Sequence, residues 1–186
     1  MKWNLTVACA VLGIGVLLGN SSPLQAAEKG SGASEDVVAQ MGNRIAEQQK
    51  IIRKNAPIHS ETGLAGYLAK ANNADSPFNA LSPAARKRFI DSLKFNENGV
   101  TSFYYADIEA ELSSSQAYAL LSLFGLQDTL RFMSKLRVDS DNDRDIMHAF
   151  SNRGPGLPPG QDHEDYWCSS RANCTRTAGS ICTGNC

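Results

Sequence analysis

The amino-acid sequence predicts an all-α protein, with a small domain of five or six helices, a Pro/Gly linker and a short disulfide-stapled C-terminal tail. Apolar residues recur at helical spacing through most of residues 34–150. Three prolines and three glycines fall within residues 151–160, a density that neither a helix nor a paired strand tolerates. Four of the five cysteines lie in the last 19 residues. We therefore expect four segments, which are a signal peptide (1–27), a helical domain (28–150), the linker (151–160) and a cysteine-rich tail (161–186).

The N-terminus is typical of a secretory signal peptide. Lys2 supplies a positive charge, residues 5–19 form an uncharged apolar run, and Ala26 and Ala27 offer small residues for cleavage. A membrane anchor is the alternative, but this run is shorter than the roughly 20 residues that span a bilayer. We expect cleavage after Ala26 or Ala27, removal of Cys9 with the leader, no stable transmembrane anchor afterwards, and a secreted or periplasmic protein.

The first helix is expected to begin at Ser34, a good N-cap residue followed by two acidic side chains, and to end before Pro57. Its apolar side chains recur near a period of 3.6 residues, which is typical of a face packed against a core. This stripe consists of Val37, Val38, Met41, Ile45, Gln48, Ile51 and Ile52.

Two more helices are expected in the next forty residues or so. Ser60 begins a weaker one that ends near Ala71, where a cluster of turn residues follows. Ser82 is an N-cap residue and Pro83 occupies the first helical position, which together predict a helix that continues to about Leu93.

Residues 100–105 are the one segment that the sequence allows as a strand. A single six-residue strand has no obvious partner in this chain, so no sheet is expected. Residues 112–115 cap the next helix, which runs through Phe124 and has Gly125 as its C-terminal glycine. Apolar residues between Leu126 and Leu136 predict a further helix.

The tail has the cysteine pattern C-x5-C-x7-C-x3-C. It contains few apolar residues, so covalent staples are needed to fold it. An exported chain with four remaining cysteines favours two disulfides among Cys168, Cys174, Cys182 and Cys186. The rival is a zinc site with four thiolates, for which only the last pair has suitable spacing. Four cysteines allow three pairings, and the sequence does not choose among them.

Several kinds of functional site are disfavoured. The 18 basic and 19 acidic residues nearly balance, which argues against a nucleic-acid partner. Residues 139–145 resemble a calcium loop, but Arg144 and Phe150 stand where that loop requires glycine and glutamate, so a polar helix-capping connection is expected. No histidine falls in a catalytic or metal-binding motif. We expect no enzyme, no cofactor and no metal.

The tail also offers a candidate contact surface for an unknown protein or cell-envelope target. Its acidic residues Asp162, Glu164 and Asp165 outnumber its arginines, which favours a specific receptor over bulk membrane lysis. The candidate contact residues are Tyr166, Trp167, Arg171, Arg176 and Ile181.

The tail opens with Trp167-Cys168 and closes with Cys182-x-x-x-Cys186, and the chain also contains the segments 81–87 and 123–126. In these features it resembles the fulvocin C-related bacteriocin precursors, in which a leader and a middle segment precede a cysteine-rich end. The resemblance implies an exported bacteriocin-like antimicrobial protein or its precursor. We expect its tail to act after cleavage in the linker. The alternative is a periplasmic or extracellular binding or inhibitor protein of the immunity type, without catalytic activity.

Overall fold

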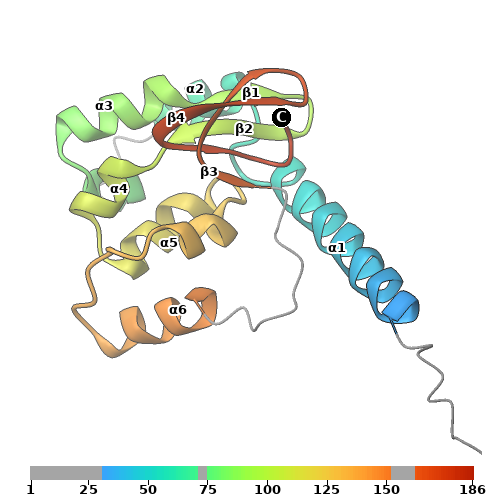
Figure 1. Ribbon diagram of the computed structural model, residues 1–186. Helices are drawn as coiled ribbons and strands as arrows, with labels where there is room; N and C mark the ends of the chain where they lie inside the picture. The colour runs from blue at the N-terminus through green and yellow to red at the C-terminus, as the bar shows by residue number, and fades with distance from the viewer. Residues whose placement is uncertain (1–30, 71–74, 152–161) are drawn as a thin grey trace, which may run out of the picture.

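The computed structural model describes residues 31–70, 75–151 and 162–186 and shows a mixed α/β protein (Figure 1). The prediction of an all-α fold is therefore wrong, because four strands form one antiparallel sheet in the order β1-β2-β4-β3. The proposed cleavage site at Ala26 and Ala27, and residues 152–160 of the expected linker, lie outside the described residues.

The helices are α1 (Ser31–Lys54), α2 (Glu61–Lys70), α3 (Pro83–Ser92), α4 (Ala106–Glu111), α5 (Ser114–Ser122) and α6 (Asp141–Ser151), with short 3-10 helices η1 (Pro77–Ala80) and η2 (Gln127–Phe132). The strands are β1 (Lys94–Asn96), β2 (Gly99–Tyr104), β3 (His163–Ser170) and β4 (Asn173–Cys182).

The sheet explains where the sequence-based prediction failed. β2 coincides with the one segment that was recognised as a possible strand. Its partners are β1, directly before it, and β4, at the other end of the chain. In the β2–β4 register, Ser102 pairs with Cys182 and Tyr104 with Ser180. The segment after the linker thus supplies two of the four strands of the sheet, next to β2, against which α3 and the end of α1 pack.

The caps and turns follow the sequence more closely. The Ser82 hydroxyl accepts a hydrogen bond from the Ala85 amide (3.3 Å) at the start of α3. Ser113 and Gln116 form a capping box at the start of α5. The helix expected between Leu126 and Leu136 is only the 3-10 turn η2, so that prediction overestimated its length.

Four phenylalanines form the centre of the core and join four elements. Phe78 (η1), Phe89 (α3), Phe103 (β2) and Phe124 (the turn after α5) are almost fully buried, and their ring centroids lie 5.8 to 6.1 Å apart in successive pairs. Such pairs contribute about 0.5–1.5 kcal/mol each beyond the area that they bury. Ile181 of β4 belongs to the same core cluster.

Helix α1 projects from the body of the molecule and only its C-terminal end lies against the sheet (Figure 1). The prediction that its apolar stripe packs against a core is wrong for most of the stripe. Val37 is 58% exposed and Met41 is 44% exposed. Regular spacing creates an apolar face but does not determine whether another element covers it.

Gly125 ends the α5 turn with φ of +67°, as its position in the sequence suggested. A Cβ atom there would lie 3.0 Å from both Arg53 Cα and the Ile52 carbonyl oxygen. Because a left-handed conformation and a backbone clash combine, Gly125→Ala is expected to lower the free energy of unfolding by about 1–3 kcal/mol, measured by urea denaturation.

Gly66→Ala is the matched control. Gly66 lies inside α2, and a Cβ atom there would meet nothing within 4 Å. Alanine is the better helix former, so this variant is expected to be unchanged or more stable by up to about 1 kcal/mol. Equal effects of the two substitutions would contradict the proposed close approach of α1 to Gly125.

Candidate functional site

The tail forms a bent hairpin whose strands β3 and β4 are two of the four strands of the sheet. β4 turns back so far that the Cα atoms of Cys174 and Cys182 lie only 6.0 Å apart. Gly179 lies in the bend with φ of +75°, and a Cβ atom on it would come within 2.7 Å of the Tyr104 ring. Glycine therefore allows the hairpin to pack directly on Tyr104.

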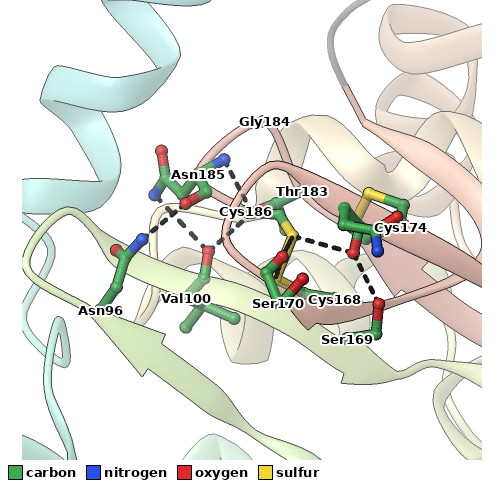
Figure 2. The surroundings of a disulfide bond; sticks show 12 residues. Asn96, Val100, Cys168, Ser169, Ser170, Cys174, Thr183, Gly184, Asn185 and Cys186 are labelled. Atoms are coloured by element: carbon green, nitrogen blue, oxygen red, sulfur yellow. Dashed lines mark hydrogen bonds between the residues drawn. A yellow bond between two sulfur atoms is a disulfide. The ribbon is translucent and has the colours of Figure 1, made fainter.

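Two disulfides lie within the tail, as the cysteine count predicted. The structure shows which of the three possible pairings they adopt. Cys168 is bonded to Cys186, and Cys174 to Cys182. Figure 2 shows the first bond beside the carbonyl oxygen of Ser170, which lies 3.2 Å from Cys186 Sγ. A disulfide sulfur carries no proton, so this is a close contact in the oxidised chain and not a hydrogen bond.

The last residues are held to the β1–β2 hairpin by hydrogen bonds that do not depend on sulfur (Figure 2). The Thr183 hydroxyl donates to the Val100 carbonyl (2.7 Å), and the Asn185 side-chain amide donates to the Asn98 carbonyl (2.7 Å). The Asn96 side-chain amide donates to the Asn185 carbonyl (2.6 Å). Thr183 and Asn185 are buried, so these bonds replace water that the groups have lost.

An open groove of about 510 Å³ lies between the tail hairpin (β3 and β4) and α3. Aromatic, hydroxyl and charged side chains line it together. The lining residues are Arg88, Asp91, Ser92, Tyr104, Trp167, Thr177 and Ser180.

Internal hydrogen bonds hold the α3 side of the groove in place. The Ser92 hydroxyl donates to the Phe89 carbonyl (2.7 Å) and accepts from the Tyr104 amide (2.8 Å), which ties the end of α3 to β2. Arg88 donates to both carboxylate oxygens of Asp107 (2.7 and 2.8 Å). This bidentate pair fixes the guanidinium at the rim. These hydrogen bonds hold the α3 side of the shallow groove, which carries aromatic and charged side chains.

The candidate contact residues of the tail do not form one surface. Trp167 is half-buried and lines the groove, whereas Tyr166 is 36% exposed and does not line it. Arg171 and Arg176 are exposed. Ile181 is fully buried, because it pairs with Phe103 across the sheet and joins the core. Its assignment to a contact surface is therefore wrong.

Asp162 is the site residue that the sequence-based analysis missed. It was counted only among the acidic residues of the tail, but its side chain is 4% exposed. The Nη2 atom of Arg53, whose side chain is 2% exposed, donates to both carboxylate oxygens of Asp162 (2.8 and 2.9 Å). Arg131 and the Gly184 amide also donate to it (3.3 and 2.9 Å). Burial by itself raises the pKa of Asp162, but the two arginines and the amide outweigh burial, so its pKa lies below the ordinary value.

This ion cluster links the end of α1, the start of the tail and the turn after β4. A polar cavity of about 320 Å³ adjoins it, lined from α1 by Gln49 and Lys50 and from the tail by Gly184 and Asn185. No feature near Asp162 in the sequence indicated burial, because its ion-pair partner Arg53 lies 109 residues away.

The polar segment 139–145 caps helices, as predicted, but it is not all connection, since its residues from Asp141 on belong to α6. The Asp143 carboxylate accepts hydrogen bonds from the Ser115 amide (2.8 Å) and from the Ser140 hydroxyl (2.7 Å). These hydrogen bonds, the Ser115 amide first, lower the pKa of Asp143 well below its usual range. Asp143 thus holds α5 and α6 together.

None of the helices in residues 31–70, 75–151 and 162–186 has the length and apolar character needed to cross a bilayer. Comparisons with protein families, with characterised proteins and with solved structures gave no match to this chain. Its function must therefore be inferred from its own residues.

Proposed function

We propose that this chain is an exported binding protein of the inhibitor or immunity type, and that it holds a partner protein in the groove between α3 and the tail hairpin. The groove carries the proposal. Trp167, Tyr104 and Arg88 line it together. Tryptophan, tyrosine and arginine are the residue types that dominate binding energy at protein interfaces.

Two further observations support export. The first 27 residues have the composition of a secretory leader. Disulfides such as Cys168–Cys186 and Cys174–Cys182 persist in oxidising compartments, including the periplasm and the extracellular space. A secreted or periplasmic protein is consistent with both.

The other candidate function is the bacteriocin-like one, in which a released tail inhibits other bacteria. The way in which the tail is built into the fold argues against its release. Ile181 and Cys182 are fully buried, and Asp162 neutralises the buried Arg53. A cut in the linker alone would leave the tail hydrogen-bonded to β2. Growth inhibition by the oxidised peptide 161–186 alone, at concentrations where the whole chain is inert, would favour the bacteriocin-like function.

Trp167→Ala tests the groove. Loss of a central aromatic anchor typically costs at least about 2 kcal/mol of binding free energy, so affinity is expected to fall roughly thirtyfold. The mature chain would be immobilised, partners from the producing bacterium's periplasmic and secreted proteins identified, and the best one titrated against each variant. Trp167 is also the only tryptophan after residue 27, so its fluorescence reports occupation of the groove directly.

Tyr166→Ala is the matched control, since Tyr166 lies next to Trp167 on β3 and does not line the groove. It is expected to keep affinity within a factor of about three. If both variants bind as well as the unmodified chain, the partner does not use the groove and the proposal fails.

A further inference from the structure

The sulfur atoms of the two disulfides form one cluster. The Sγ atoms of Cys168, Cys182 and Cys186 all lie within 4.8 Å of one another, although Cys182 belongs to a different bond from the other two. Cys174 is bonded to Cys182 and so adds the fourth sulfur at the edge of the group. Figure 2 shows Cys168 and Cys186 bonded beside Cys174.

The backbone around these cysteines is also held by hydrogen bonds that do not involve sulfur. Cys182 pairs with Ser102 in the sheet, and Cys168 lies opposite Cys174 in the hairpin. The Cys186 amide donates to the Thr183 carbonyl (2.9 Å), and its own carbonyl accepts from the Ala172 amide (2.7 Å). We therefore expect the four side chains to remain neighbours when the S–S bonds are opened.

Solvent reaches the cluster from one side. A hollow of about 250 Å³ is lined by Cys168 and Cys186 together with Ser170 and Arg171. Cys182 is fully buried behind them. A small thiol reductant or a metal ion can thus reach the outer sulfurs, while the inner one lies in the dry environment that strengthens metal–ligand bonds.

We propose that the reduced chain binds one zinc-class cation through Cys168, Cys182 and Cys186, with Cys174 as the fourth ligand. Zn–S bonds of about 2.3 Å in tetrahedral geometry place sulfurs about 3.8 Å apart. The three clustered sulfurs need to move by about an ångström to reach that geometry. The spacing Cys182-x-x-x-Cys186 also matches the short ligand spacing of structural zinc sites.

The chemistry has two steps. A dithiol of the thioredoxin class supplies two electrons and two protons to each disulfide, so that two dithiols are oxidised and four cysteine thiols form. The cation then binds the thiolates, and the displaced protons pass to water. The oxidised chain has no thiolate at these positions, so disulfides and metal occupy the cluster in different redox states.

Cobalt binding tests this site. The mature chain, reduced with a phosphine and freed of it under argon, is titrated with Co²⁺, whose tetrahedral thiolate complexes absorb visible light. We expect one cobalt per chain, displacement by one equivalent of Zn²⁺, and no binding by the oxidised chain. Affinity should be at least tenfold higher in native buffer than in denaturant, because the folded chain gathers the sulfurs in advance.

Two variants compare Cys182, which belongs to the group of three clustered sulfurs, with Cys174, which lies at its edge. Cys182→Ser is expected to weaken cobalt binding at least tenfold more than Cys174→Ser, because Cys182 belongs to the clustered group of three and Cys174 does not. A reduced chain that binds no cobalt overturns the proposal, whether or not it stays folded. Equal losses in the two variants, or equal affinity in denaturant, would overturn it as well.

Discussion

A chain that ends before Asp162 is expected not to fold. It loses β4, and with it the fully buried Ile181 that packs in the phenylalanine core. It also leaves the buried Arg53 without its carboxylate partner. An uncompensated buried charge costs about 3–5 kcal/mol, and the loss of a core isoleucine side chain costs about 2–5 kcal/mol. Their sum is comparable with the whole stability of a typical domain, about 5–15 kcal/mol.

Circular dichroism and urea denaturation would test this prediction on residues 28–160 and on the full mature chain. We expect a cooperative transition only for the full chain. The informative control is a mature chain cut within 152–160 and left with its tail attached non-covalently, which should keep that transition. A shortened chain that unfolds cooperatively at a similar urea concentration would show that the tail is dispensable, as the hypothesis of a released peptide requires.

The fold class could not be predicted from periodicity, for a reason visible in β3 and β4. Both strands are bent and carry irregular register, and their side chains are mostly polar. Strand propensity and alternation therefore give almost no signal there. One partner of β2 is the three-residue strand β1, too short to recognise, and the other lies at the opposite end of the sequence, so the recognised strand seemed to stand alone. By contrast, caps such as Ser82 and Ser113 act within four residues, which is why the starts of α3 and α5 were predicted correctly. The start of α1 was not, since this helix begins at Ser31 and not at Ser34.

The candidate site shows the same division between local and distant signals. The cysteine count and the leader predicted the disulfides without any knowledge of the fold. The groove could not be predicted, because Tyr104, Trp167 and Arg88 come from three elements that only the sheet brings together. The burial of Asp162 could not be predicted, since acidic residues are normally exposed and burial becomes tolerable only through a partner such as Arg53.

Asp162→Asn is expected to lower the free energy of unfolding by about 3–5 kcal/mol, because the neutral amide leaves Arg53 buried without a counter-charge. The comparison is Asp139→Asn, which breaks the exposed pair between Arg137 and Asp139 (3.2 Å). Exposed pairs are worth less than about 1 kcal/mol, so that variant should unfold at nearly the same urea concentration as the unmodified chain.

The same carboxylate predicts how stability depends on pH. The pKa of Asp162 is lower in the folded chain than the ordinary value of about 3.9 that applies after unfolding. The ionised group therefore contributes its full stability above about pH 4, and this contribution is lost as the pH falls below that value. The unmodified chain should lose more stability between pH 5 and pH 3 than Asp162→Asn does, with Asp143 accounting for part of the remaining loss in both.

The double variant Arg53→Met/Asp162→Asn decides whether the effect comes from the ion pair. Replacing both charges removes the uncompensated guanidinium, so the double variant should lose less stability than the sum of the single losses by at least about 1 kcal/mol. Full recovery is not expected, because Arg131 and the Gly184 amide still point at position 162 and would face an amide in place of a carboxylate. Additive losses would mean that Arg53 and Asp162 stabilise the fold independently, and the cluster that joins α1 to the tail would then not act as a unit.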